Sequence, residues 1–432
     1  MKFLTLSLAL ASVTATLLIA QQTAATPKPT PSGTIATRAL AQQLAHEATD
    51  DRIRAYGRLL KAAPDNVANQ LGLIAAYLQK LRESADFGYL DRAAKLVDRM
   101  LEKDSGNFAA LRYQNEIDLQ RHDFRTVAER SKTMIKDNPS DAGNWANLGD
   151  ASMELGDYDR AGQAYVKMFS LQPGLGSYNR LAYWRFVTGD GQTAVQLMQN
   201  AVAAGDAVPE NTAWCLAELG DMYFKLGRVP DAADAYNAAL ALFPRLHRAW
   251  AGLGKTEGAT GKKEAAIRNY ERAQSIVPLV EYAGALEDLY TASGLPRKAS
   301  EQRDLVATIE TLGKVTNEKT NRNLALLLAD HNRDLDFALK LMNAEVPVRG
   351  DVYTWDALSW VLFKSGRLQE AQEVSVKALK LRTPEPLFYY HASKIANAAG
   401  HEEASREYSQ RLMSLNSKFD FGKTDRKSTT VP

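Results

Sequence analysis

The stretch that decides the fold begins with Asn144-Trp145-Ala146-Asn147-Leu148-Gly149-Asp150 and continues at fixed spacing to Gly156, Ala161, Tyr165 and Pro173. Apolar residues recur at helical spacing on both sides of Gly156, which predicts two short helices joined at that glycine. A glycine just past a helix adopts the left-handed conformation at little cost. Pro173 ends the second helix because it supplies no amide donor and clashes with the preceding turn. The stretch therefore predicts one helix pair of about 34 residues.

The same marks recur along the chain. Turn glycines stand at Gly156, Gly189, Gly227, Gly261, Gly294, Gly366 and Gly400. The alanines that follow them, 33 to 39 residues apart, are Ala161, Ala194, Ala232, Ala266, Ala299, Ala338, Ala371 and Ala404. One helix pair cannot bury its apolar face alone, so the units are expected to stack into a solenoid with a continuous core.

This pattern of recurring residues resembles the tetratricopeptide repeat, whose unit of about 34 residues carries a large residue, a Leu-Gly pair, aromatics, alanines and a proline in that order. The Leu-Gly pairs are Leu148-Gly149, Leu219-Gly220 and Leu253-Gly254. Small residues there remove a side chain where the first helix approaches the second. The resemblance implies an all-α fold, a right-handed superhelical solenoid of stacked antiparallel helix pairs.

The phase of the marks sets the expected boundaries. We expect N-terminal capping helices at 35–64, about ten repeats over 65–417 and a disordered tail at 418–432. The units lie near 65–106, 107–139, 140–174, 175–207, 208–245, 246–279, 280–314, 315–348, 349–384 and 385–417. Three units depart from the pattern, because one has an insertion around Arg82 to Gly88, and His122 and Arg333 replace the turn glycine in two others.

The first residues are expected to serve targeting. Residues 1–25 run from basic Lys2 through an apolar stretch to small residues at Thr23 and Ala25, which is the layout of a secretory signal peptide cleaved after Ala25. Residues 26–34 form a proline-rich linker. The chain is therefore expected to be exported, to the periplasm or secreted. The alternative is that residues 1–25 stay attached as an N-terminal anchor, and the chain is expected to contact a membrane only through that segment.

Composition gives no sign of a nucleic-acid partner. The 432 residues include 53 Lys and Arg against 51 Asp and Glu, so no overall charge draws the chain to an anionic polymer. The single cysteine, Cys215, excludes an intramolecular disulfide and a multi-thiolate metal site. We expect it to be a buried apolar residue.

No catalytic constellation is found. Ala249-Trp250-Ala251-Gly252-Leu253-Gly254-Lys255-Thr256 ends like a phosphate-binding loop, but it lacks the first glycine and a preceding strand. Its Leu-Gly pair should lie inside a helix, where the backbone amides are already bonded. No two of the six histidines are spaced i, i+4. We therefore expect a non-enzyme, with no catalytic or metal-ligating residues and no cofactor.

The resemblance also implies that the first helices of the units line a concave groove that contacts a protein or peptide partner. Aromatic and charged residues side by side are typical of such surfaces. The alternative is that several of them belong to the core. The fourteen candidates are Asn179, Arg180, Tyr183, Phe186, Trp214, Asp221, Phe224, Arg248, Lys255, Tyr353, Trp360, Phe363, Tyr390 and Lys394.

Two functions stay open at this stage. The favoured one is a scaffold or adaptor that binds a protein segment in the groove and catalyses nothing. The other is a glycan-binding or small-ligand-binding module of an envelope or export assembly, since stacked aromatics can also hold sugars. Self-association through the end repeats is possible in either case. The sequence does not identify the partner or the pathway.

Overall fold

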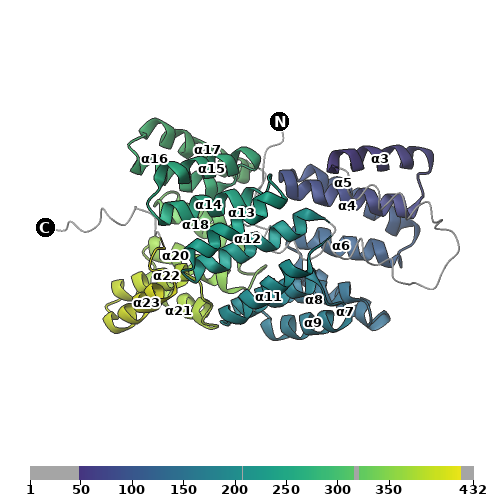
Figure 1. Cartoon of the computed structure of the whole chain (residues 1–432). Coiled ribbons are helices and arrows are strands. Elements are labelled where there is room, and N and C mark those ends of the chain that lie inside the picture. Colours follow the sequence, from purple (N-terminus) through teal and green to yellow (C-terminus); the bar gives the residue numbers. More distant parts are fainter. Residues whose placement is uncertain (1–47, 207, 316–320, 420–432) are drawn as a thin grey trace.

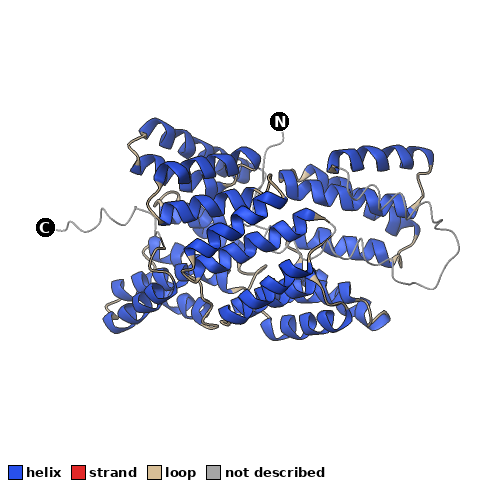
Figure 2. Ribbon diagram, viewed as in Figure 1, coloured by secondary structure: helices blue, strands red, loops and turns tan. Residues whose placement is uncertain are grey.

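The computed structural model describes residues 48–206, 208–315 and 321–419. The expected signal peptide and linker, and most of the expected tail, lie outside these ranges. The described residues form 21 helices and no strand (Figure 2). None of these helices is both long enough and apolar enough to cross a membrane.

Helix α3 (Thr49–Ala62) precedes ten helix pairs, in which consecutive helices pack against each other. The first five pairs are α4 (Val67–Ser84) with α5 (Gly88–Lys103), α6 (Phe108–Gln120) with α7 (Phe124–Asp137), α8 (Ala142–Glu154) with α9 (Tyr158–Leu171), α10 (Leu175–Val187) with α11 (Gly191–Ala204), and α12 (Pro209–Lys225) with α13 (Val229–Leu242). The other five are α14 (His247–Ala259) with α15 (Lys263–Ile276), α16 (Val280–Ala292) with α17 (Pro296–Val315), α18 (Arg322–Asp330) with α19 (Leu335–Glu345), α20 (Val352–Lys364) with α21 (Leu368–Leu379), and α22 (Pro386–Ala398) with α23 (Glu402–Leu415). This is the all-α solenoid that the repeats predict (Figure 1).

The turn inside each pair contains a left-handed residue, and in four pairs an aspartate caps the second helix, α7, α9, α11 or α19. Gly156 has φ +77°, and the Asp157 carboxylate accepts a hydrogen bond from the amide of Arg160 at 3.2 Å. Such a cap satisfies one of the free amides at a helix start. Ala85 and His122 take the left-handed conformation in turns without glycine.

In the turn between α18 and α19 the sequence expectation is wrong by one residue. The residue that corresponds to the turn glycine is Asn332, with φ +50°, and not Arg333. Asparagine tolerates this conformation better than other side chains, because its short polar side chain can bond locally. The backbone turn is therefore kept without a glycine.

A glycine against a tyrosine ring fixes the distance between the helices of a pair. A Cβ atom on Gly149 would lie 2.3 Å from Cε1 of Tyr165, and one on Gly220 would lie 2.6 Å from the same atom of Tyr236. Both rings are almost fully buried. Each tyrosine hydroxyl donates to the aspartate that follows the glycine, Tyr165 to Asp150 at 2.9 Å and Tyr236 to Asp221 at 2.7 Å.

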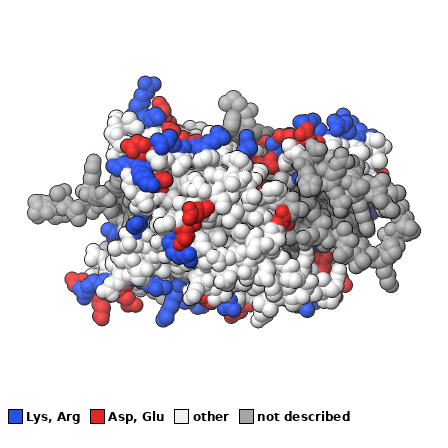
Figure 3. Space-filling view, in the orientation of Figure 1, with Lys and Arg blue, Asp and Glu red and all other residues white. Residues whose placement is uncertain are grey.

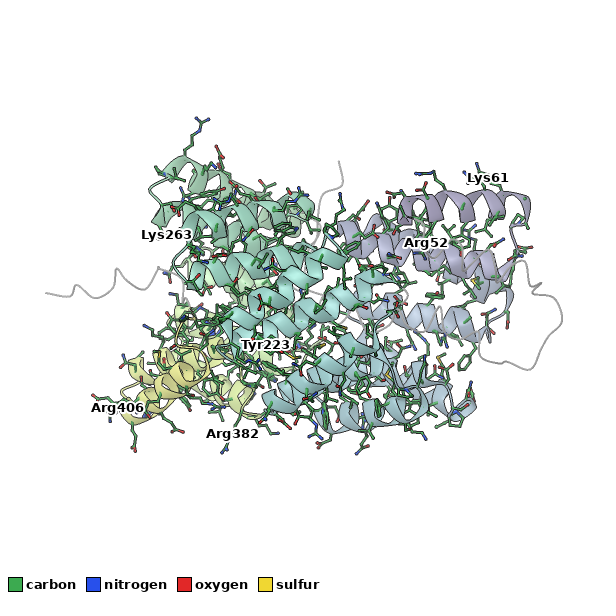
Figure 4. All side chains as sticks on the ribbon, viewed as in Figure 1. Arg52, Lys61, Tyr223, Lys263, Arg382 and Arg406 are labelled. Carbon is green, nitrogen blue, oxygen red and sulfur yellow. The ribbon has the colours of Figure 1, made fainter. Side chains whose placement is uncertain are left out.

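The alanine after each turn is buried in every pair but the last. Those with at most 1% exposure are Ala161, Ala194, Ala232, Ala266, Ala299, Ala338 and Ala371. Ala404 on α23 is half-buried, because no described helix pair packs on that end of the solenoid. The outer face of α3 at the other end is also open: Figure 4 shows Lys61 pointing away from the body, whereas Arg52 lies toward α4.

The solenoid also contacts itself after a full superhelical turn. The amide of Gly350, just before α20, donates to the carbonyl of Glu154 in α8 at 3.0 Å. The Thr383 hydroxyl donates to the backbone carbonyl of Val187 at 2.5 Å. The side-chain amide of Asn416 donates to the backbone carbonyl of Phe224 at 2.6 Å. The turns after α8, α10 and α12 thus meet the segments before α20, before α22 and after α23. Figure 1 shows α21 beside α11.

This contact extends to the end of the described chain. Phe419, which is expected in the disordered tail, packs against Phe224 with the ring centroids 5.9 Å apart. At the other end, Ala85 in the turn after α4 shares a buried apolar cluster with Leu279 and Tyr282. The contacts therefore join units that lie five or six apart in the chain.

Replacement of Gly149 by alanine should destabilise the fold. The new Cβ would overlap the buried Tyr165 ring, and we expect the free energy of unfolding to fall by about 1–3 kcal/mol. Urea unfolding followed by circular dichroism measures this. The control is Gly57→Ala in α3, where a Cβ meets no atom within 4 Å. There we expect a gain of about 0.5–1 kcal/mol from helix propensity. Equal effects of the two variants would contradict the proposed packing constraint.

Replacement of Gly350 by valine should open the self-contact. A Cβ on Gly350 would lie 2.6 Å from the carbonyl oxygen of Leu155. Since that neighbour is backbone, the two turns must separate. We expect a larger radius of gyration in small-angle X-ray scattering and faster amide exchange in residues 349–352. Gly57→Val should change neither, and an unchanged radius for Gly350→Val would refute the contact.

Candidate functional site

The structure places six of the fourteen candidate residues inside the protein. Arg180 and Phe186 are each 2% exposed, and Trp214 is 3% exposed. The six buried residues are Asn179, Arg180, Phe186, Trp214, Phe224 and Trp360. The eight half-buried residues are Tyr183, Asp221, Arg248, Lys255, Tyr353, Phe363, Tyr390 and Lys394. The expectation that these positions all line an open groove is wrong for the first six.

The groove closes because charged residues of neighbouring first helices pair inside it. Arg180 of α10 makes two hydrogen bonds of 2.9 Å to the carboxylate of Asp150 in α8. Arg248 of α14 lies 3.1 Å from Asp221 of α12 in the same way. In both cases the carboxylate also accepts a hydrogen bond from the tyrosine hydroxyl of its own unit, Tyr165 or Tyr236. These residues hold successive units in register and leave no functional group for a partner.

A second paired cluster lies where the two superhelical turns meet. Lys225 of α12 lies 2.7 Å from Glu385, and its ammonium nitrogen is 5.6 Å from the centroid of the Tyr353 ring. Burial opposes the charge on Lys225, but Glu385 raises the pKa of Lys225 above its usual value. Arg322 lies 3.0 Å from Asp351 beside the same ring. Tyr353 therefore acts as part of the closure rather than as a free surface aromatic.

The remaining candidates come together near the C-terminal end of the solenoid. The ring centroid of Trp360 in α20 lies 5.3 Å from that of Phe363 in the same helix and 5.9 Å from that of Tyr390 in α22. Lys364 lies 5.3 Å above the Trp360 ring, and Lys394 lies 5.4 Å above the Tyr390 ring. We name these five residues the C-terminal aromatic surface.

The base of this surface is held rigidly. The indole nitrogen of Trp360 donates to Asp330 of α18 at 2.7 Å, and the Trp360 ring stacks on His391 with 4.1 Å between centroids. His391 in turn lies 3.0 Å from Asp356. Three first helices thus fix one tryptophan, while the edges of Phe363 and Tyr390 and the two lysines stay partly accessible to solvent. The arrangement can bind apolar groups and carboxylates.

Sequence reasoning missed Asp330 and its part in orienting Trp360. The signal was present, because Asp330 precedes Trp360 by 30 residues, as Asp150 precedes Arg180. Residues that contact each other across neighbouring first helices are separated in sequence by slightly less than one repeat length. A search for polar pairs at that spacing would have found both contacts.

The two other sequence features have structural explanations. Residues 249–256 lie within α14, so the backbone amides of the phosphate-loop-like stretch are bonded inside a helix, as expected. Cys215 is 1% exposed, and burial raises the pKa of its thiol, which disfavours the reactive thiolate. Figure 3 shows Lys, Arg, Asp and Glu mixed along the margins of one face, with a largely uncharged middle.

Comparison with known proteins identifies the repeats. Models of the tetratricopeptide repeat match residues 142–174, 175–245 and 217–279. No curated protein matches the sequence of the chain. These matches cover the middle of the solenoid, where the glycine and tyrosine marks are clearest.

Several solved structures match the chain, and one of them, with a TM-score above 0.5, shows the same fold. The hetero-tetramer Cut9-Hcn1 of the APC/C matches 81% of this chain and 68% of its own, with 14% identity and a TM-score of 0.51. MamA matches 38% of this chain and 95% of its own, with 24% identity and a TM-score of 0.33. The human IFIT1 dimer with PPP-AAAA matches 94% of both chains, with 12% identity and a TM-score of 0.47. The repeat models identify residues 142–279 as tetratricopeptide repeats, and the helix pairs on both sides of this region continue the same fold.

Proposed function

We propose that this protein is a non-enzymatic scaffold that binds a segment of a partner protein on the C-terminal aromatic surface. The observation that carries the proposal is that Phe363, Tyr390 and two lysines lie half-buried around a fixed tryptophan. Tetratricopeptide repeat proteins generally act through protein partners. The repeat models and the fold support this general role.

The chemistry of the surface indicates the kind of segment. Aromatic side chains on a rigid base supply most of the affinity in protein interfaces. Lys364 and Lys394 extend over the rings and can pair with carboxylates, so the preferred segment combines apolar and acidic side chains. A preorganised surface loses little side-chain freedom on binding.

The glycan alternative is less well supported by this geometry. A sugar stacks on the open face of an aromatic ring, but Trp360 is 3% exposed, and one of its faces stacks on His391. We therefore give the protein partner priority.

We further propose that the protein acts outside the cytoplasm. The basic Lys2 followed by an apolar run, with small residues at Thr23 and Ala25, supports export. The intact mass of the purified protein tests this, because cleavage after Ala25 would give a chain that starts at Thr26.

Substitution of the accessible residues should abolish partner binding without unfolding the protein. We expect Phe363→Ala combined with Lys394→Glu to weaken binding by at least about tenfold, since an aromatic anchor is lost and a charge reversed. Partners crosslinked in whole cells are quantified by mass spectrometry, and the affinity of the main one is then measured by calorimetry. The control is Val376→Ala with Lys380→Glu on and just beyond α21, where Val376 is 66% exposed. Recovery of the same partners at the same affinity by both double variants would reject the proposed surface.

A further inference from the structure

A cavity of about 230 Å³ lies between α12, α14 and α16, away from the C-terminal aromatic surface. Its walls include Asp221, Arg248, Lys255, Tyr270, Glu281 and Tyr282. The first helices of three consecutive units contribute to it, and Tyr270 comes from α15. It belongs to the interior face that elsewhere is filled by paired charges. What the cavity can bind therefore depends on which of the residues in its wall are ionised and which already have a counter-ion.

Two of the charged walls are already neutralised. Arg248 lies 2.5 Å from Glu218 and 3.1 Å from Asp221, and Lys255 lies 3.2 Å from Asp221. Burial alone would raise the pKa of Asp221, but Lys255 and Arg248 lower it well below its usual range. Both cations therefore have carboxylate partners, and Asp221 stays ionised.

Glu281 is the wall group that is not neutralised. Its Oε1 accepts a hydrogen bond from the side-chain amide of Asn323 in α18, whereas its buried Oε2 has no hydrogen-bond partner among the described residues. Burial raises the pKa of Glu281 to about 7. A buried acceptor without a partner costs free energy that an incoming donor would recover.

We propose that this cavity binds an organic cation, an ammonium or guanidinium group, with Glu281 as its counter-ion. With Glu281 ionised, the site holds three carboxylates, Glu218, Asp221 and Glu281, against the two cations Arg248 and Lys255. A bound cation restores neutrality and pairs with the Glu281 carboxylate in the cavity wall. Hydrogen bonds between ionised partners are about twice as strong as neutral ones.

The other walls suit the same ligand. The rings of Tyr270 and Tyr282 lie 6.3 Å apart at 50° and border the cavity, and aromatic rings attract cations. The Tyr282 hydroxyl is engaged at 2.7 Å by Nδ1 of His247. Burial lowers the pKa of His247 to about 3, so this histidine is neutral near pH 7 and does not repel the ligand.

The cation can come from a free small amine or from a lysine or arginine side chain of a partner segment. The side chain of Lys255 is 41% exposed, so the cavity reaches the surface there. Both sources place the same group against Glu281. The site is independent of the C-terminal aromatic surface, and its test does not use the partner sought there.

Calorimetric titration of the full-length protein at pH 8 tests the proposal. The free probes are methylguanidinium and propylammonium, and the peptide probe is acetyl-Gly-Arg-Gly-amide, with citrulline in place of arginine as its neutral control. We expect a cationic probe to bind and the citrulline peptide not to bind. Binding of the peptide alone identifies a partner side chain as the source, and equal binding of the free cations identifies a small amine.

Variants assign the binding to the cavity. Glu281→Gln keeps the shape of the side chain and should weaken binding at least tenfold, whereas Glu264→Gln on the exposed face of α15 should leave it unchanged. Ala251→Met would fill the cavity and should also abolish binding, with every charge kept. Thermal unfolding shows whether each variant is folded.

The pH dependence gives a separate test. The charged and titratable groups near Glu281 are Arg248, His247 and Lys255 on α14, Asp221 on α12, Tyr270 on α15 and its own neighbour Tyr282. Burial raises the pKa of Glu281 to about 7, so Glu281 changes charge between pH 6 and pH 8, whereas the lowered pKa values keep His247 neutral and Asp221 ionised there. Binding needs the ionised form of Glu281, so affinity should fall about tenfold from pH 8 to pH 6. Failure of every cationic probe to bind, or binding that Glu281→Gln and pH leave unchanged, would overturn the proposal.

Discussion

The contact between a glycine of one helix and a tyrosine ring of the next sets the separation of the helices in three central pairs, α8 with α9, α12 with α13 and α14 with α15. The backbone of Gly149 lies against Tyr165, and Gly220 repeats the arrangement with Tyr236. Because the ring leaves no space for a Cβ, the two helices of a unit have one separation. Repetition of one unit geometry gives a constant rotation per unit. The pitch that brings units six apart into contact therefore follows from a local packing constraint.

How much of this the sequence predicts depends on the range of the interaction. Glycines, alanines and prolines act within one unit, so their spacing predicts the helix pairs, the buried alanines and the turn at Gly156. The contact of Gly350 with Glu154 depends on rotation summed over six units, which no local pattern encodes. The groove positions failed for another reason: Arg180 and Trp214 are buried by polar and charged residues of neighbouring first helices, Asp150 and Arg248. Trp360 is buried as well, whereas Phe363 and Tyr390 beside it stay half-buried.

Paired charges rather than apolar residues fill much of the interior face. Burying two ions is costly unless the geometry of the pair is good, and removal of one partner leaves the other charge uncompensated. Arg180 meets this condition with two hydrogen bonds to Asp150. Such directional pairs admit one register between neighbouring first helices, whereas apolar contacts would tolerate sliding. Glu281 does not meet the condition within the described residues, and that contrast distinguishes its cavity from the filled interior.

The hydrogen bond from Thr383 to Val187 joins residues 196 positions apart. In an ordinary solenoid each repeat contacts only its neighbours, so folding can begin anywhere and the ends fray first. Here the last repeats support the middle ones, and loss of either end removes contacts from the centre. Such non-local contacts slow folding, because a long segment of chain must be closed before they form. The array should therefore behave as one cooperative block in its final folding step, with the C-terminal repeats docking last.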